Sequence, residues 1–145
     1  MLAGVERDFE IVITERAGQA MEMTRDLDIA RSVWCPASSL QFWLSRYAGV
    51  VTVSGDGGLY EVINGLYLRP DWPGVRELIR VGIVPGGSGH AVHCSLLHHQ
   101  RERFSSELEV SALSLAHDNN LHHDILECQT RNKETQPGII AFIFE

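Results

Sequence analysis

Short apolar runs alternate with segments of helical periodicity along most of the chain. Three runs that are short and rich in β-branched residues are typical of buried strands: 9–14, 50–53 and 80–84. Apolar side chains spaced three or four positions apart, with polar residues between them, predict helices at 17–29, 59–68 and 90–99. Because strands alternate with helices, we expect a parallel sheet with crossover helices.

Other segments are less regular or lie nearer the C-terminus. The pattern at 107–116 leaves a helix and a strand equally open, whereas 125–128 and 139–144 are typical of strands. Proline ends the second helix within 69–74, because it removes an amide and restricts the residue before it. Segment 32–45 holds two tryptophans and a serine pair without a steady period, so we expect an insert or a hydrophobic surface segment.

Composition narrows the class of protein without giving an activity. The 145 residues, 44% hydrophobic and 21% charged, fit one folded domain. No apolar run approaches the ~18 residues of a membrane span, and the N-terminus lacks a signal-peptide pattern. Three cysteines without a close pair favour a reduced, cytoplasmic chain. The net charge of -7 without a basic stripe argues against nucleic-acid binding.

Two glycine-rich turns follow two of the predicted strands and precede helices: SGDGG at 54–58 and PGGSG at 85–89. Ligands of parallel sheets bind beyond the carboxyl ends of the strands. Glycine lets the backbone approach a ligand closely, and amides at a helix N-terminus attract phosphate. We therefore expect phosphate binding at these turns, although neither matches the P-loop or dinucleotide fingerprint.

Asp56 places a negatively charged carboxylate among the backbone amides that we expect to bind phosphate, so its presence needs an explanation. One interpretation is chemical: the carboxylate binds magnesium or accepts the proton of an attacking hydroxyl. The other is structural: the aspartate caps the helix that follows it. The residue pattern alone leaves both interpretations open.

Longer motifs around these turns resemble the sphingosine kinases of the diacylglycerol kinase catalytic family. The resemblance rests on five segments: SGDGGLYEVINGLYLRPDW, VGIVPGGSGHAV, FEIVITERAGQAMEMTRDLD, ELEVSALSLAHDN and DILECQT. It implies a Rossmann-like, three-layer nucleotide-binding fold with a parallel sheet. It also implies ATP-dependent phosphorylation, with Mg²⁺, of the primary hydroxyl of a sphingoid base.

The resemblance assigns roles to particular residues. Asp56 matches the general base, while no residue is predicted as a metal ligand. The residues that match nucleotide-binding positions are Thr14, Ser54, Gly55, Gly57, Glu61, Gly87 and Ser88. Physically this is coherent, because phosphoryl transfer depends mainly on positioning and charge neutralisation.

The sequence also departs from the family pattern. His90 stands where the family has asparagine, and Ala17 where close relatives carry a second arginine. Family members begin with a strand and an Asn-Pro glycine-rich turn, and continue into a β-rich lipid-binding domain. We therefore interpret 1–145 as a partial N-terminal nucleotide-binding domain, truncated at both ends, with 32–45 as an insert. We expect this domain to be a weakly active or inactive kinase. We expect it in the cytoplasm, and peripheral association with membranes is compatible with this interpretation.

Three alternatives remain beside this interpretation. The chain could be a non-catalytic nucleotide-binding or partner-binding fragment that forms oligomers through an open sheet edge. A zinc site could use His90, His93 and Cys94 on one helical face, although surface histidines are the simpler interpretation of this segment. NAD kinase shares a GDG-type turn, but the EVINGL and RPDW segments favour the lipid kinase.

Overall fold

A computed structural model describes residues 10–35, 40–45, 47, 49–97, 106–116, 122, 124–128 and 139–143. The helices are α1 (Gln19–Asp26), α2 (Asp56–Tyr67), α3 (Trp72–Val75), α4 (Ala91–Leu97) and α5 (Glu107–Ala116). The strands are β1 (Ala30–Cys35), β2 (Leu40–Ser45), β3 (Gly49–Ser54), β4 (Arg80–Pro85), β5 (Asp124–Cys128) and β6 (Ile139–Ile143).

β3 and β4 form the parallel pair that the alternation of strands and helices predicts. Their register runs from Gly49 opposite Arg80 to Ser54 opposite Pro85. Both strands therefore end at the same edge, and each leads directly into a glycine-rich turn. The mixed α/β class with a parallel sheet is confirmed, and so are both strand predictions.

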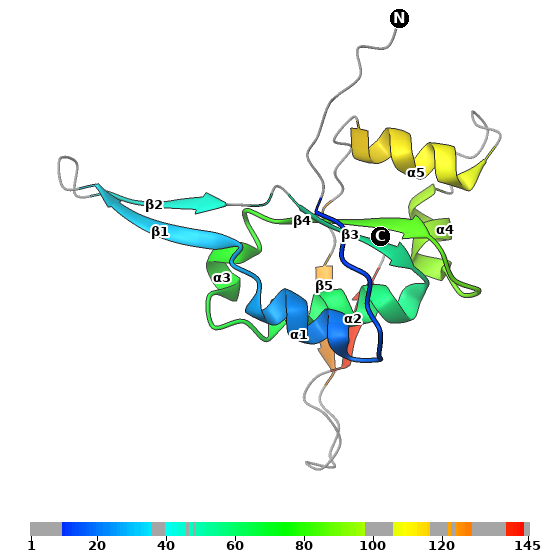
Figure 1. Cartoon of the computed structure of the whole chain (residues 1–145), viewed down its shortest axis with the longest axis horizontal. Coiled ribbons are helices and arrows are strands. Elements are labelled where there is room, and N and C mark those ends of the chain that lie inside the picture. Colours follow the sequence, from blue (N-terminus) through cyan, green and yellow to red (C-terminus); the bar gives the residue numbers. More distant parts are fainter. Residues whose placement is uncertain are drawn as a thin grey trace, which may run out of the picture.

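Helices cover both faces of the β3–β4 pair (Figure 1). α2 packs on one face, with α1 beside it, while α5 lies over the other face. Gly82 of β4 makes the second packing possible, because a Cβ there would meet the side chain of Leu115 from α5. Segment 107–116, for which the sequence left helix and strand open, is therefore a helix in a third layer.

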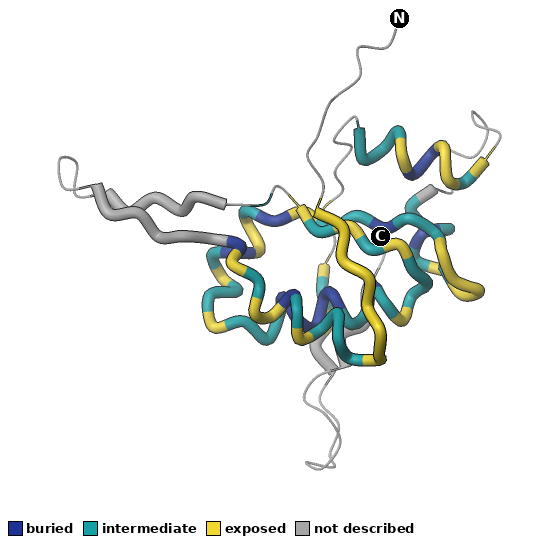
Figure 2. The backbone as a smooth tube through the Cα atoms, viewed as in Figure 1, coloured by how far each residue is buried: buried dark blue, intermediate teal, exposed yellow. Residues whose placement is uncertain are grey.

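The core lies between α2 and its neighbours, where Figure 2 shows the buried positions in dark blue. One cluster of buried side chains joins α2 to the end of α3 and to residues after α1 and α3: Ile29, Val62, Leu66, Val75 and Ile79. A second cluster joins α2 to β4 and holds Leu59, Ile63 and Ile83. The same helix thus supplies both clusters, which fixes its N-terminus relative to the ends of β3 and β4.

The remaining strands pair antiparallel. β1 and β2 form a ladder from Ala30–Ser45 to Cys35–Leu40 and extend away from the body of the molecule (Figure 1). This pair contains most of the predicted insert 32–45, whose status as an insert stays a prediction. β5 and β6 were correctly predicted as strands, but they pair with each other rather than joining the parallel sheet.

Two expectations about burial and one about secondary structure are wrong. Residues 10–14 form no strand, and Ile11 and Ile13 are 85% and 82% exposed. A strand needs a partner for its backbone groups, and β3 pairs only with β4 within the described part of the chain. β3 itself is only half-buried, because Val51 and Val53 face away from α2 and are 39% and 72% exposed.

α1 and α2 approach each other closely through a contact that the sequence pattern does not reveal. A Cβ on Gly65 of α2 would overlap the Thr24 hydroxyl and the Met21 carbonyl of α1. Thr24 is 5% exposed and its hydroxyl donates to the Ala20 carbonyl over 2.7 Å. The predicted apolar face of α1 is therefore incomplete, because a threonine occupies its most buried position.

Candidate functional site

The two glycine-rich turns pack against each other backbone to backbone. The Asp56 amide donates to the Gly89 carbonyl over 2.8 Å. A Cβ on Gly55 would overlap that carbonyl, and one on Gly87 would lie 2.7 Å from the Gly55 nitrogen. Glycine at positions 55 and 87 is therefore required for the contact between the turns.

The Asp56 carboxylate binds the first amides of α4. Oδ2 accepts from the Ala91 amide over 2.9 Å, and Oδ1 accepts from the Val92 amide over 3.1 Å. A carboxylate is well placed there, because a helix N-terminus presents unpaired donors and a partial positive charge. The structural interpretation of Asp56 is thus right in kind, but the capped helix is α4 rather than α2, which Asp56 begins.

Capping leaves room for a second role of the same carboxylate. An ionised carboxylate has about four lone-pair sites, and these two hydrogen bonds use two of them. The neighbouring turn 86–89 is exposed, and no atom of the described residues lies within 4 Å of where a Cβ would stand on Gly57 or Gly89. A ligand can therefore approach the backbone on this side of the turns.

Ser54 joins the end of β3 to the start of α2. Its Oγ lies 2.6 Å from Thr52 Oγ1 and donates to the Gly55 carbonyl over 3.0 Å. A Cβ on Gly58 would overlap the Ser54 side chain. The sequence analysis did not identify Gly58 as a site residue. Its lack of a side chain is nevertheless what allows the Ser54 side chain to pack against the first turn of α2.

Glu61 and Thr14 lie toward α1 rather than in the turns. The Glu61 carboxylate accepts from the amides of Gly18 and Ala20 over 2.8 and 3.2 Å, and so caps α1 from α2. Gly18 has a φ of 78°, which favours glycine. Thr14 is exposed in the segment before α1. The other predicted site residues, from Ser54 to Gly57 and at Gly87 and Ser88, belong to the two turns and the start of α2.

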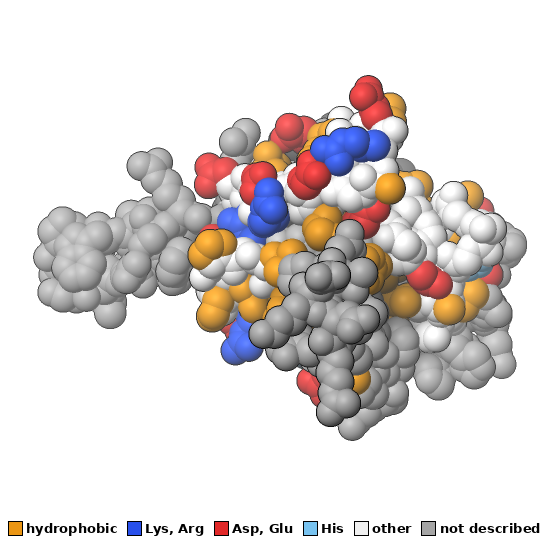
Figure 3. Space-filling model, turned by 90° about the horizontal axis from the view of Figure 1, so that it is seen from below, with side chains coloured by type: hydrophobic (Ala, Val, Ile, Leu, Met, Phe, Trp, Pro, Cys, Tyr) orange, Lys and Arg blue, Asp and Glu red, His pale blue; other side chains and the backbone are white. Residues whose placement is uncertain are grey.

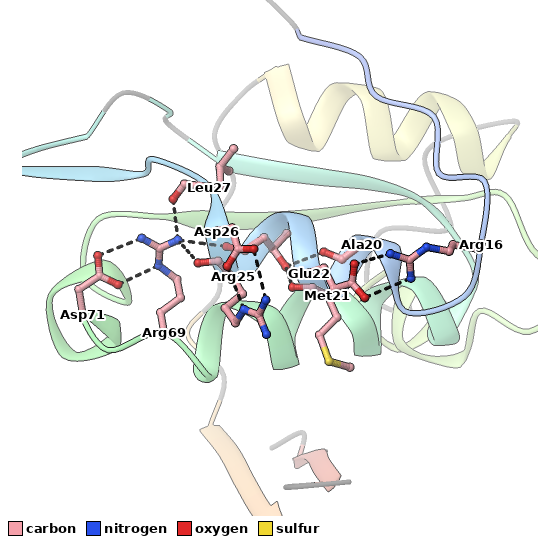
Figure 4. A network of polar contacts seen from close by, with 10 residues as sticks. Arg16, Ala20, Met21, Glu22, Arg25, Asp26, Leu27, Arg69 and Asp71 are labelled. Atoms are coloured by element: carbon pink, nitrogen blue, oxygen red, sulfur yellow. Dashed lines mark hydrogen bonds and ion pairs between the residues drawn. The ribbon is translucent and has the colours of Figure 1, made fainter.

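Arg69 of the RPDW segment connects the end of α2 to the end of α1 (Figure 4). Its guanidinium makes two hydrogen bonds with Asp71, of 2.8 and 2.9 Å, and its side chain is 8% exposed. It also donates to the carbonyls of Thr24, Arg25 and Leu27 over 3.1, 2.7 and 2.6 Å. These carbonyls are the acceptors that a helix C-terminus leaves without intrahelical partners. The RPDW segment therefore stabilises the packing of the end of α2 against the end of α1.

His90 lies beside the second turn, immediately before α4. Its Nδ1 is 3.3 Å from the Gly87 carbonyl oxygen, and its Nε2 is 3.3 Å from Glu107 Oε2 of α5. The ring of His90 therefore contacts both the second turn and α5. His93, one turn further along α4, is 1% exposed, so the expectation of surface histidines is wrong for this residue.

The charged surface mixes both signs on the face that Figure 3 shows, where acidic and basic side chains lie close together. Exposed ion pairs of α1 and its flanks join Arg16 to Glu22 and Arg25 to Asp26. Among the helices that the structure describes, none is both long and apolar enough to cross a membrane.

Comparison with known proteins identifies the class to which this fold and these turns belong. The diacylglycerol kinase catalytic domain matches residues 1–128, and the chain belongs to this family. Human sphingosine kinase 2 is 38% identical over 101 residues, and human sphingosine kinase 1 is 34% identical over 99 residues; each alignment covers 68% of this chain. Arabidopsis thaliana sphingosine kinase 1 is 40% identical over 88 residues, or 61% of this chain.

The resemblance to sphingosine kinases is therefore confirmed. The aligned part spans 13% of human sphingosine kinase 2, 22% of human sphingosine kinase 1 and 15% of the Arabidopsis thaliana protein. The chain thus corresponds to a small part of these relatives.

Proposed function

We propose that this chain carries the phosphate-binding turns and the general base of an ATP-dependent kinase that phosphorylates the primary hydroxyl of a sphingoid base. The observation that carries the proposal is the position of Asp56. Its carboxylate is fixed at the contact between the two turns by two amides of α4. The names of the relatives support the substrate class, since they are sphingosine kinases.

The turns fit the phosphates of a nucleotide. Gly55 and Gly87 pack too closely to carry side chains, whereas Gly57 and Gly89 face open space. The start of α2 contributes a helix N-terminus, which favours anions. When bound, ATP would supply the transferred phosphoryl group and Mg²⁺ would neutralise charge on its phosphates.

Each predicted residue has a part in this proposal. Asp56 accepts the proton of the attacking hydroxyl through a lone pair that the α4 amides leave unused. The backbone of Gly57, Gly87 and Ser88 binds phosphate, while Ser54 and Gly55 fix the shape of the first turn. Glu61 acts through α1, because its hold on the Gly18 amide fixes the segment that bears Thr14.

The test is phosphorylation of sphingosine by the purified chain with Mg²⁺ and ATP, beside Asp56→Asn and the exposed control Asp26→Asn. We expect low turnover, since the aligned part of this chain spans only 13% and 22% of the two human relatives, and catalysis depends on how completely the hydroxyl is positioned. Turnover that Asp56→Asn abolishes and Asp26→Asn retains would support the proposal. Turnover that survives Asp56→Asn in a chain shown to be folded by circular dichroism would refute it.

A second candidate function is association with a partner, including a second copy of the chain, without catalysis. It is favoured by the apolar side chains that β3 exposes, Val51 and Val53. β3 also pairs only with β4 within the described part of the chain, and an unpaired strand edge invites pairing. Sedimentation velocity of the chain and of Val53→Lys tests it: association that the lysine abolishes would support this function, and a monomeric parent would refute self-association.

A further inference from the structure

We propose that His90, Cys94 and Glu107 form a zinc site between the start of α4 and α5, which adjoins the second glycine-rich turn and does not depend on the proposed function. One ligand atom from each of these side chains lies within 4.8 Å of the other two. All three side chains are half-buried. His90 and Cys94 are four residues apart, so they lie on the same side of α4 at its start.

The set of donors favours zinc over magnesium. Imidazole nitrogen, thiolate sulfur and carboxylate oxygen are all ligands that Zn²⁺ accepts, and thiolate in particular selects soft or borderline metals. Magnesium prefers six oxygens in octahedral geometry. Three protein ligands would leave the fourth tetrahedral position to solvent.

The distance between His90 and Glu107 fits this geometry. Their Nε2 and Oε2 atoms are 3.3 Å apart, which is long for a charge-assisted hydrogen bond of about 2.7–2.9 Å. Two ligand atoms at zinc bond lengths of about 2.0–2.1 Å are separated by about 3.4 Å along a tetrahedral edge. The Cys94 sulfur lies within 4.8 Å of both of these atoms, so zinc binding requires it to move closer, to a zinc–thiolate bond length of about 2.3 Å.

The other nitrogen of His90 is held as metal-bound histidines usually are. Nδ1 lies 3.3 Å from the Gly87 carbonyl oxygen, and a carbonyl can only accept, so the proton of the neutral ring belongs on Nδ1. The lone pair then lies on Nε2, the atom that faces Glu107. A hydrogen bond from the second nitrogen to a backbone carbonyl orients the ring of a metal-bound histidine.

The structure selects a different ligand set from the one that sequence spacing suggests. His93 was a candidate because it shares a helical face with His90, but its Nε2 lies 3.4 Å from the Ser111 hydroxyl. It is also buried, at 1% exposed, and packs between α4 and α5. Glu107 takes its place as a ligand, although it lies 17 positions beyond His90 in the sequence.

Such a site would join the N-terminus of α5 to the start of α4, and through His90 to the Gly87 carbonyl. His90 supplies both connections.

The experiment is titration of the tag-free, metal-free full chain with Co²⁺, followed by displacement with Zn²⁺. We expect the chain to bind one equivalent of Co²⁺ in tetrahedral geometry. The absorption spectrum should then show visible d–d bands and a thiolate-to-cobalt charge-transfer band. Cys94→Ser should abolish the charge-transfer band. His90→Asn and Glu107→Gln should each weaken binding about tenfold or more.

Controls separate this site from the other cysteines and from folding. A Cys35→Ser/Cys128→Ser double variant should keep the band, and zinc should raise the melting temperature of the parent by several degrees but not that of His90→Asn. The proposal is overturned by absence of the band in the parent, by a band that survives Cys94→Ser, or by its loss in the double variant. Circular dichroism of each metal-free variant shows whether it is folded.

Discussion

Two acids of α2 make nearly the same contacts in very different surroundings. The Asp56 carboxylate accepts hydrogen bonds from two backbone amides at the start of α4. The Glu61 carboxylate accepts hydrogen bonds from two backbone amides at the start of α1. Glu61 lies where two helices pack closely, whereas Asp56 lies beside an exposed turn with open space at Gly89. The capping contacts thus do not distinguish the two acids, whereas access for a ligand does, and Asp56 is the acid for which we propose a catalytic role.

The two regions also differ in what holds them together. α1 and α2 are joined by side chains, through Arg69, Glu61 and the close contact at Gly65. The glycine turns are joined mainly by backbone, while the side chains of Asp56 and His90 connect them to the start of α4. Substitutions in the first region should therefore change stability, while those in the second should mainly change ligand binding.

The largest expected effect comes from Arg69→Met. The substitution leaves three carbonyls at the C-terminal end of α1 and the Asp71 carboxylate without their cation, which should cost about 3 kcal/mol of unfolding free energy. The matched control is Arg76→Met, whose ion pair with Glu77 is exposed and should contribute less than about 1 kcal/mol. Urea unfolding measures both, and equal losses would contradict a structural role for the RPDW segment.

Gly65→Ala should have the next largest effect. The new methyl group would overlap the Met21 carbonyl, and because that atom belongs to the backbone, α1 must move. We expect a loss of about 2 kcal/mol. Gly57→Ala is the control in the same helix, where nothing lies within 4 Å of the new Cβ. It should be neutral or gain about 0.5 kcal/mol, so a similar loss in both variants would show that helix packing is not the cause.

The two helix caps provide a more direct comparison. Asp56→Ala and Glu61→Ala each remove a carboxylate from two amides, and each should cost about 1 kcal/mol. Thermal unfolding followed by circular dichroism measures the two losses side by side. A loss at Glu61 with none at Asp56 would mean that the α4 cap contributes nothing to stability.

The smallest expected effect is a dependence on pH at the start of α1. A hydrogen bond from the Arg16 guanidinium lowers the pKa of Glu22 from its ordinary value of 4.5. A lowered pKa in the folded state means that the pair stabilises the fold above 4.5 and that this contribution is lost as pH falls through the lowered value. Both side chains are exposed, so the effect is small.

Glu22→Gln tests this dependence. The variant should be slightly less stable than the parent at neutral pH, and the difference in urea midpoint should disappear in acid. A difference that grows on acidification would have the wrong sign for this ion pair.

The elements that the sequence predicts well are those that local pattern determines. β3, β4 and α2 follow from β-branched runs and helical spacing, and glycines place both turns at the strand ends. The segment 9–14 has the same apolar pattern as β3, but a strand also requires a neighbour with which to pair its backbone. Local pattern carries no information about that neighbour.

Contacts across the molecule account for most of what the sequence does not predict. Glu61 meets Gly18 from 43 positions away, and Arg69 meets Leu27 from 42 positions away. Neither spacing repeats along the chain, so periodicity cannot reveal it. Similarly, capping of α4 by Asp56 depends on the parallel register of β3 and β4, which brings their following turns together.

The central claim is that the two glycine-rich turns bind the nucleotide. Its most direct test is a titration of the ¹⁵N-labelled full chain with Mg²⁺ and ATP, in which the amide chemical shifts are measured by NMR. The account predicts saturable shifts concentrated at Gly55, Gly57, Gly87, Ser88 and Gly89, with much smaller changes in α1 near Glu22. Gly89→Val, which fills the open space beside the turn, should weaken binding without unfolding the chain. Absence of saturable shifts, or shifts centred on α1 rather than the turns, would contradict the assignment of this edge of the sheet as the nucleotide site.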